Sequence, residues 1–183
     1  MGSPIRNWGF LLAIIAMVLV ADQVTKRVVV DTVALGETIQ PVPALSPYFQ
    51  VTRIFNTGSA FGILPQASDL FLVIAIVVVL AMIYFYPRLE GRMLITRIAI
   101  GLVCGGALGN AFDRVQYEHV VDFIHYQIPG LFSNVSNIAD HAVVFGVALM
   151  LLENWRSDRA QKRQAALADN GDSPSPDPEP GDD

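Results

Sequence analysis

Residues Leu70–Tyr86 read LFLVIAIVVVLAMIYFY, a run without a charged side chain. Three more stretches lack charge in the same way, namely Trp8–Ala21, Ile98–Phe112 and Ala142–Leu152. Each is shorter than the roughly 20 residues that cross about 30 Å of hydrocarbon, but one further turn into its polar flanks brings it to that length. We therefore expect four transmembrane helices, at about residues 8–30, 69–86, 95–113 and 138–155.

The overall composition is typical of a membrane protein. Of the 183 residues, 52% are hydrophobic and only 16% are charged, and the mean hydropathy is +0.44. These values lie outside the usual range for a soluble domain of this length. The expected fold class is mainly α, a polytopic membrane protein, and nucleic acid is not an expected partner.

The first apolar run needs its own argument, because a basic residue followed by an apolar segment also occurs in cleaved signal peptides. Here Arg6 precedes the run, but small residues suited to cleavage do not follow it. The run continues instead into Asp22–Val30, which has the pattern of a helix prolonged past its apolar part. We expect this helix to be retained.

The distribution of Lys and Arg predicts the orientation in the membrane. Four helices place both termini and the Pro87–Thr96 loop on one side, where the flanks carry eight basic residues, against four on the other side. The eight are Arg6, Arg88, Arg92, Arg97, Arg156, Arg159, Lys162 and Arg163, and the four are Lys26, Arg27, Arg53 and Arg114. Because basic flanks favour the cytoplasm, we expect cytoplasmic termini and two longer loops on the outer side.

The two outer loops differ in character. The first, about residues 31–68, contains Phe49–Phe55, where apolar and polar residues alternate as in a half-buried strand. A small extracytoplasmic β-sheet is expected there. The second, about residues 114–137, mixes aromatic, histidine and apolar residues around a Pro129-Gly130 turn, which favours an interfacial loop or helix acting as a lid.

The last part of the chain has a different composition again. Residues 156–183 begin basic and end in a run of Asp, Glu, Pro, Ser and Gly. Such a segment cannot bury a core, so we expect a disordered cytoplasmic tail beyond a membrane domain formed by residues 1–155. The tail supplies most of the formal net charge of −5, which therefore says nothing about the substrate.

Two aspartates in this apolar chain, Asp122 and Asp140, are candidate catalytic groups, because a carboxylate at a bilayer is costly unless it is paired, hydrated or turned inward. Asp122 lies between Val121 and Phe123, and such apolar surroundings raise the pKa of a carboxyl group. Asp140 follows Asn137, a good N-cap for the fourth helix, by three residues. If the two carboxyl groups converge, one can draw a proton from water while the other donates to a peptide carbonyl oxygen, as in a carboxylate dyad.

Other polar residues mark the outer ends of the first and third helices. Asp22 and Lys26 form an i,i+4 pair, which is more often structural than catalytic. Asn110, Asp113 and Arg114 lie on one face of the third helix. The series that leads to Asp113 has a small residue at every fourth position, a spacing typical of close helix packing, at Gly101, Gly105 and Gly109.

Five short motifs resemble, in the same order, those of one known family. They are Asp22-Gln23-Val24-Thr25-Lys26, Asn56-Thr57-Gly58-Ser59-Ala60-Phe61-Gly62, Gly106-Ala107-Leu108-Gly109-Asn110-Ala111-Phe112-Asp113-Arg114, Val120-Val121-Asp122-Phe123 and Asn137-Ile138-Ala139-Asp140. On these motifs, about residues 7–155 resemble the bacterial lipoprotein signal peptidases, also called signal peptidase II or prolipoprotein signal peptidase.

The resemblance implies an aspartic endopeptidase of the bacterial inner membrane, with its active site near the outer face. Such an enzyme cleaves the signal peptide from diacylglyceryl-modified prolipoproteins just before the lipid-bearing cysteine, needs no metal or cofactor, and is blocked by globomycin. Asp122 and Asp140 match the catalytic dyad, and membrane lipid is a further expected partner. The residues that match substrate-binding or supporting positions are Asn56, Gly58, Asn110, Arg114, Asn137, Asp22, Lys26 and Asp113.

The last motif departs from the family pattern, which commonly reads Phe-Asn-Val-Ala-Asp followed by a small residue. Here Ser136 replaces the Phe and His141 follows the Asp. We expect Ser136 to alter packing beneath the loop, and His141 to shift the pH dependence of the dyad.

Two functions of other classes remain open. A metal-dependent membrane hydrolase would use His119, Asp122, His125, Asp140 and His141, but the sequence has no His-Glu-x-x-His spacing. A proton-coupled carrier would use the carboxylates as relays, but four helices without repeat symmetry disfavour it. Inhibition by a chelator would identify the hydrolase, and dependence on membrane potential would identify the carrier.

Overall fold

The computed structural model describes residues 4–46, 48–58, 67–89 and 94–171. Within them four helices are long and apolar enough to cross a membrane, which confirms the predicted fold class. They are α1 (Pro4–Thr32), α2 (Ser68–Phe85), α3 (Leu94–Tyr117) and α4 (Ile138–Gly171). Short 3-10 turns lie at Pro43–Leu45 and Tyr86–Arg88.

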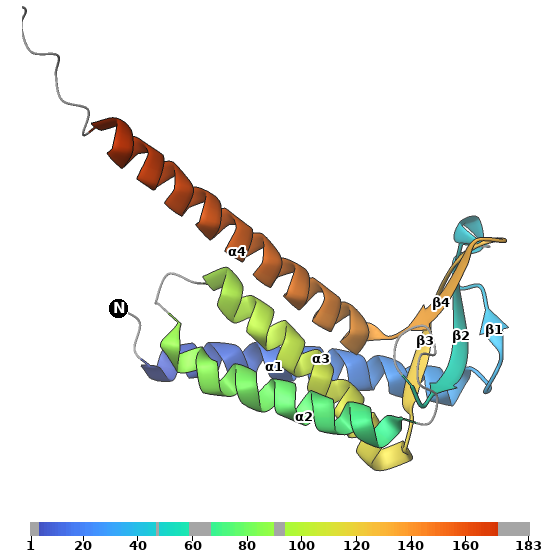
Figure 1. Cartoon of the computed structure of the whole chain (residues 1–183). Coiled ribbons are helices and arrows are strands. Elements are labelled where there is room, and N and C mark those ends of the chain that lie inside the picture. The colour runs from blue at the N-terminus through green and yellow to red at the C-terminus, as the bar shows by residue number, and fades with distance from the viewer. Residues whose placement is uncertain (1–3, 47, 59–66, 90–93, 172–183) are drawn as a thin grey trace, which may run out of the picture.

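Helix α3 is the centre of the bundle. It packs against α1, α2 and α4, and 56% of its apolar window is buried, against 11% for α2. Figure 1 shows α1 and α2 running in nearly the same direction, whereas α3 and α4 are inclined to them, and α4 extends past the end of the bundle that lies away from the sheet. Most of the apolar surface of α2 is therefore left for lipid to cover.

The predicted glycine series lies where α3 contacts α1. A Cβ atom added at Gly101 would lie 2.6 Å from Cγ2 of Ile14, and one at Gly105 would lie 2.7 Å from Cβ of Val18. Both distances are below normal contact, so glycine is what allows α1 to approach α3 this closely. Gly109 continues the series at the side chain of Asp22.

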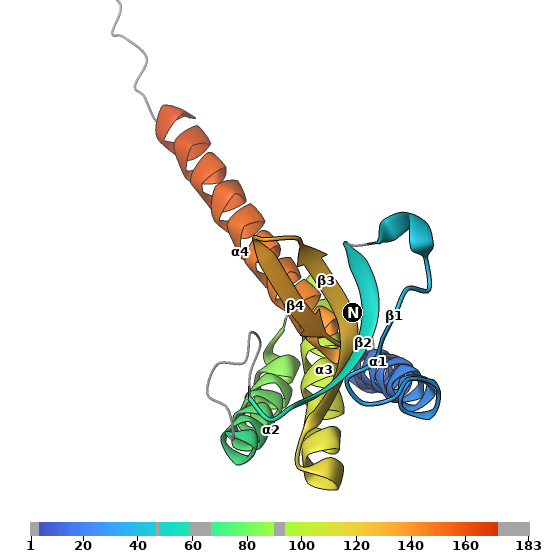
Figure 2. The same ribbon diagram turned by 90° about the vertical axis from the view of Figure 1, so that its right-hand side faces the viewer.

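A four-stranded antiparallel sheet covers one end of the bundle (Figures 1 and 2). Its strands are β1 (Thr38–Ile39), β2 (Phe49–Asn56), β3 (Val120–Ile128) and β4 (Phe132–Ser136), in that order across the sheet. Phe123 and Ile124 of β3 pack with Val29 and Val33 at the end of α1. This contact fixes β3 over the end of the bundle that carries the sheet and brings its polar residues to the end of α3 and the start of α4.

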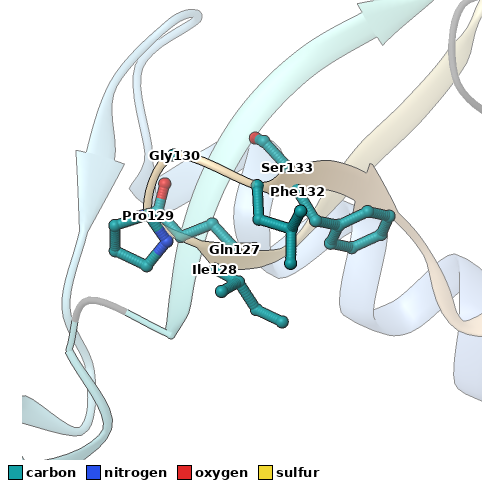
Figure 3. Close-up of a pocket in the computed structure, with 7 residues that line it drawn as sticks. Gln127, Ile128, Pro129, Gly130, Phe132 and Ser133 are labelled. Atoms are coloured by element: carbon teal, nitrogen blue, oxygen red, sulfur yellow. The ribbon is translucent and has the colours of Figure 1, made fainter.

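The second outer loop differs from its prediction, because it forms the β3–β4 hairpin rather than an interfacial loop or helix. Its β-branched and aromatic residues favour a strand, and Gly130, with φ of +77°, makes the turn. The tip of the hairpin is apolar and surrounds a hollow of about 340 Å³ (Figure 3). Leu131 at this tip is 81% exposed.

The expectation of a disordered tail from residue 156 is wrong as far as Gly171, because α4 continues to that residue. The reason is compositional: Arg, Ala, Gln, Lys and Leu predominate in residues 156–168, and all are strong helix formers. Gly171, a poor helix former, is the last residue of α4. Residues 172–183 of the expected tail, and the Ser59–Gly62 part of the second motif, lie outside the described residues.

Candidate active site

A pocket of about 330 Å³ lies where the sheet meets the bundle. One part of its lining is polar, and these residues come from β2 and the turn after it, β3, α3 and α4: Asn56, Gly58, Asn110, Arg114, Asp122 and Asp140. The rest is apolar and comes mainly from α2, α3 and α4: Phe71, Ile74, Ala75, Val78, Val103, Ala107, Val120, Val143 and Val144. The structure thus brings six of the predicted site residues to one cavity.

Asp122 is fully buried in β3, where both carboxylate oxygens accept hydrogen bonds. Asn56 Nδ2 donates to Oδ2 at 2.8 Å, and Asn137 Nδ2 donates to Oδ1 at 2.6 Å. Burial, and then the negative charge of Asp140, raise the pKa of Asp122 to about 7, although the two amide bonds act in the opposite direction. This carboxyl group therefore carries a proton for a large fraction of the time at neutral pH.

Asp140 lies in the first turn of α4, and Asn137 caps that helix as predicted. The backbone N–H of Asp140 donates to Asn137 Oδ1 at 2.9 Å. The side chain of Asp140 faces the pocket, and its Oδ1 accepts a 2.7 Å hydrogen bond from Asn110 Nδ2. One oxygen of this carboxylate is thus fixed by an amide from α3.

The two asparagines connect the two carboxylates. Asn137 Nδ2, which donates to Asp122, also donates to Asn110 Oδ1 at 3.2 Å. Asn110 in turn holds Asp140. The four side chains form one hydrogen-bonded series in the order Asp122, Asn137, Asn110, Asp140. Residues far apart in sequence therefore hold each other in place.

Behind this series is a buried ion cluster. Lys26 Nζ lies 2.8 Å from Asp22 Oδ2 and 2.8 Å from Asp113 Oδ2, and it donates to Asn110 Oδ1 at 3.1 Å. All three charged residues are nearly inaccessible, and the described pocket lining includes none of them. Asp22 and Lys26 therefore lie behind the described pocket lining, and their role in support stays a prediction.

Arg114 holds the end of β2 against the pocket. Its Nη2 donates to the carbonyl oxygen of Gly58 at 3.0 Å, and its guanidinium lies over the ring of Phe71. Gly58 N–H donates to Asn56 Oδ1 at 2.9 Å, which orients the amide that binds Asp122. Arg114 therefore acts on Asp122 through the turn that follows β2.

The histidines of the metal hypothesis have other contacts. His125 is hydrogen-bonded to Thr52 Oγ1 and Ser133 Oγ within the sheet, at 2.8 and 2.9 Å. His119 packs on the ring of Phe55. His141 Nδ1 lies 2.6 Å from the carbonyl oxygen of Asn137. In the part of the chain that the structure describes, no three His, Cys, Asp or Glu side chains are grouped as metal ligands would be.

The sequence interpretation missed two groups. Gln23, inside the first motif, reaches Asp22, Asp113 and the carbonyl oxygen of Gly109. Its position three residues before Lys26, on the same side of the helix, was a usable signal. The apolar lining from α2 was also missed, because an apolar residue on a membrane helix looks the same in sequence whether it faces a pocket or lipid.

Comparison with known proteins agrees with the geometry. The family model for signal peptidase (SPase) II matches residues 14–156. The lipoprotein signal peptidase of Pelotomaculum thermopropionicum is 39% identical over 158 residues, covering 85% of this chain and 98% of that protein. The lipoprotein signal peptidase of Halothermothrix orenii is 36% identical over 146 residues, covering 80% of this chain and 95% of that protein.

The structural relatives are bacterial membrane enzymes. Two solved structures superpose with TM-scores of 0.74 and 0.70, at 33% and 34% sequence identity. They cover 82% and 79% of this chain, and 90% and 92% of their own chains. With four apolar helices of sufficient length, the chain is a multi-pass bacterial membrane protein, and by the match of the family model it belongs to the signal peptidase II family.

Proposed function

We propose that this protein is an aspartic endopeptidase that removes the signal peptide from diacylglyceryl-modified prolipoproteins, cleaving just before the lipid-bearing cysteine. The observation that carries the proposal is the joining of Asp122 and Asp140 through Asn137 and Asn110 at the wall of one pocket. The curated relatives are lipoprotein signal peptidases, and two carboxyl groups of different protonation are what water-mediated peptide hydrolysis needs.

The apolar part of the pocket supports a lipid-bearing substrate. On α3, Val103 lies about two helical turns before Asn110, and on α2, Val78 lies about two turns after Phe71, whose ring contacts Arg114, so the cavity extends along the helices. Ile74 and Val144, from α2 and α4, also line it and are 45% and 66% exposed. Acyl chains that remain in the bilayer would therefore reach the pocket from the side, while the peptide lies under the sheet.

The burial and hydrogen bonds of the two carboxyl groups support the following division of roles. Asp140, ionised, accepts a proton from water, and the water oxygen attacks the carbonyl carbon of the scissile peptide. Asp122, protonated because its pKa is raised to about 7, donates a hydrogen bond and then its proton to the carbonyl oxygen. As the tetrahedral intermediate collapses, Asp140 gives its proton to the leaving nitrogen, the C–N bond breaks, and Asp122 regains its proton.

The proposed orientation follows from the basic flanks: both termini in the cytoplasm of a bacterium, and the pocket near the outer face of the inner membrane. Diacylglyceryl-modified prolipoprotein would then enter from the outer leaflet. Globomycin, which the family resemblance implies as an inhibitor, would compete with it for the pocket.

The test is cleavage in detergent by the purified protein, with a chelator present, of one prolipoprotein in two forms, with and without the diacylglyceryl group. The expected result is cleavage of the modified form, with mass spectrometry placing the new N-terminus at the lipid-bearing cysteine. Equal cleavage of both forms would contradict the substrate assignment. Cleavage that occurs only when the chelator is left out would revive the metal-dependent hydrolase.

A further inference from the structure

The residue before each proposed catalytic aspartate donates its backbone N–H to a second, buried carboxylate. Ala139 N–H, immediately before Asp140, donates to Asp22 Oδ1 at 3.0 Å. Val121 N–H, immediately before Asp122, donates to Asp113 Oδ2 at 3.1 Å. The distance between Asp22 and Asp113 therefore affects the distance between the backbone segments that carry Asp140 and Asp122.

Gln23 links these two supporting carboxylates directly. Its Nε2 lies 3.1 Å from Asp22 Oδ2 and 2.8 Å from Asp113 Oδ1, and 3.3 Å from the carbonyl oxygen of Gly109. Lys26 also contacts both carboxylates. Asp22 and Asp113 thus share two neighbours from α1, one cationic and one neutral.

Lys26 and Gln23 constrain the two carboxylates in different ways. Lys26 supplies one positive charge to two carboxylates. Its ammonium is a point charge whose N–H directions are not fixed, and it also donates to Asn110. The primary amide of Gln23 is planar, with two N–H groups in fixed directions. It donates to Asp22 on α1 and to Asp113 on α3. The amide therefore fixes the direction and the distance between these two carboxylates, which charge neutralisation alone does not fix.

We propose that Gln23 is a positioning residue: by holding Asp22 and Asp113 at a fixed spacing, it sets, through Ala139 and Val121, the spacing of Asp140 and Asp122. The inference rests on the proposed function of those two residues. A small error in this spacing is enough to matter, because a misplacement of about 1 Å lowers a catalytic rate roughly 100-fold.

The test compares Gln23→Met and Gln23→Asn with Gln116→Met, in the full-length protein. Methionine keeps the length of the side chain without its donors, and asparagine keeps the amide but is one methylene too short to reach both carboxylates. Gln116 lies on the exposed side of α3, so its replacement is a matched control. The measurements are kcat, KM for diacylglyceryl-modified prolipoprotein, and the melting temperature in detergent, with Asp122→Asn in the same series.

The expected result is a kcat about 10- to 100-fold lower in both Gln23 variants, with KM and the melting temperature retained and the Gln116 variant like the parent. An unchanged kcat would overturn the inference. A lower kcat together with a higher KM and a lower melting temperature would also overturn it, as would failure of both Gln23 variants to fold, because Gln23 would then be needed for folding alone. If the parent does not cleave the prolipoprotein, the proposed function itself fails, and if Asp122→Asn cleaves like the parent, the carboxylate dyad fails; both results are distinct from an unchanged kcat in the Gln23 variants alone.

Discussion

Asn137 lies with its Nδ2 2.6 Å from Asp122 Oδ1, a short hydrogen bond that joins the first residue before α4 to the middle of the sheet. The same side chain caps α4 through its Oδ1, which accepts from Asp140 N–H. One residue therefore orients one proposed catalytic carboxyl group directly and fixes the backbone of the other.

Replacement of Asn137 by alanine should lower both activity and stability. A hydrogen bond contributes about 0.5–3 kcal/mol, most when its acceptor is charged, and an N-cap contributes about 0.5–2 kcal/mol. We expect kcat to fall by at least about tenfold, together with a lower melting temperature. Asn134→Ala, a matched change on the partly exposed part of β4, should change neither quantity. Equal effects at the two positions would contradict the role given to Asn137.

The raised pKa of Asp122 predicts an unusual pH dependence of stability. The folded protein keeps a proton on this group up to about pH 7, whereas the unfolded chain loses it near its ordinary pKa of about 3.9. The contribution of Asp122 to the free energy of unfolding therefore falls as the pH rises from about 4 to about 7, and is constant above that.

The measurement is the melting temperature at pH 5 and pH 8, for the parent and for Asp122→Asn. Asparagine has no proton to lose, so the melting temperature of the variant relative to the parent should be higher at pH 8 than at pH 5. A difference that is the same at both pH values would show that Asp122 titrates alike in the folded and unfolded protein.

The same group should limit activity on the alkaline side. If Asp122 is the proton donor, kcat should decrease as the pH rises through about 7, where its carboxyl group ionises. Initial rates at saturating substrate, measured from pH 5 to pH 9, test this directly. A rate that keeps rising to pH 9 would assign the donor role elsewhere.

The contact between α3 and α4 should be intolerant of even one methyl group. A Cβ atom at Gly106 would overlap the carbonyl oxygen of Ala139, which is backbone and cannot turn away. Gly106→Ala should lower the free energy of unfolding by about 1–3 kcal/mol and also lower kcat, because α4 carries Asp140. Gly9→Ala, where nothing lies within 4 Å of the added atom, should leave the melting temperature and kcat unchanged. Thermal unfolding and cleavage rates of both variants are the measurements.

Local patterns in the sequence were enough to predict the four helices and one detail of the site. The four apolar runs predicted α1 to α4, and the spacing of Asn137 and Asp140 predicted the cap of α4. Both depend on residues within a few turns of one another. The glycine series predicted close packing for the same reason.

The errors and omissions lie where the outcome depends on distant contacts. The mixed residues of β3 become a strand because Ile124 and Phe123 pack on Val29 of α1 and on Val33, which follows it, and because β2 pairs with β3. The bonds from Asp22 to Ala139 and from Asp113 to Val121 involve backbone N–H groups. Every residue except proline has such a group, so no sequence pattern marks them.

The carboxylate dyad is tested most directly by the single-turnover cleavage rate of diacylglyceryl-modified prolipoprotein by the parent, Asp122→Asn and Asp140→Asn, with a cooperative melting transition above the assay temperature in each protein as the control for folding. We expect both variants to bind substrate and neither to cleave it at a measurable rate, since each lacks one of the two proton-transfer groups. Cleavage at the parental rate by either variant would contradict the carboxylate dyad.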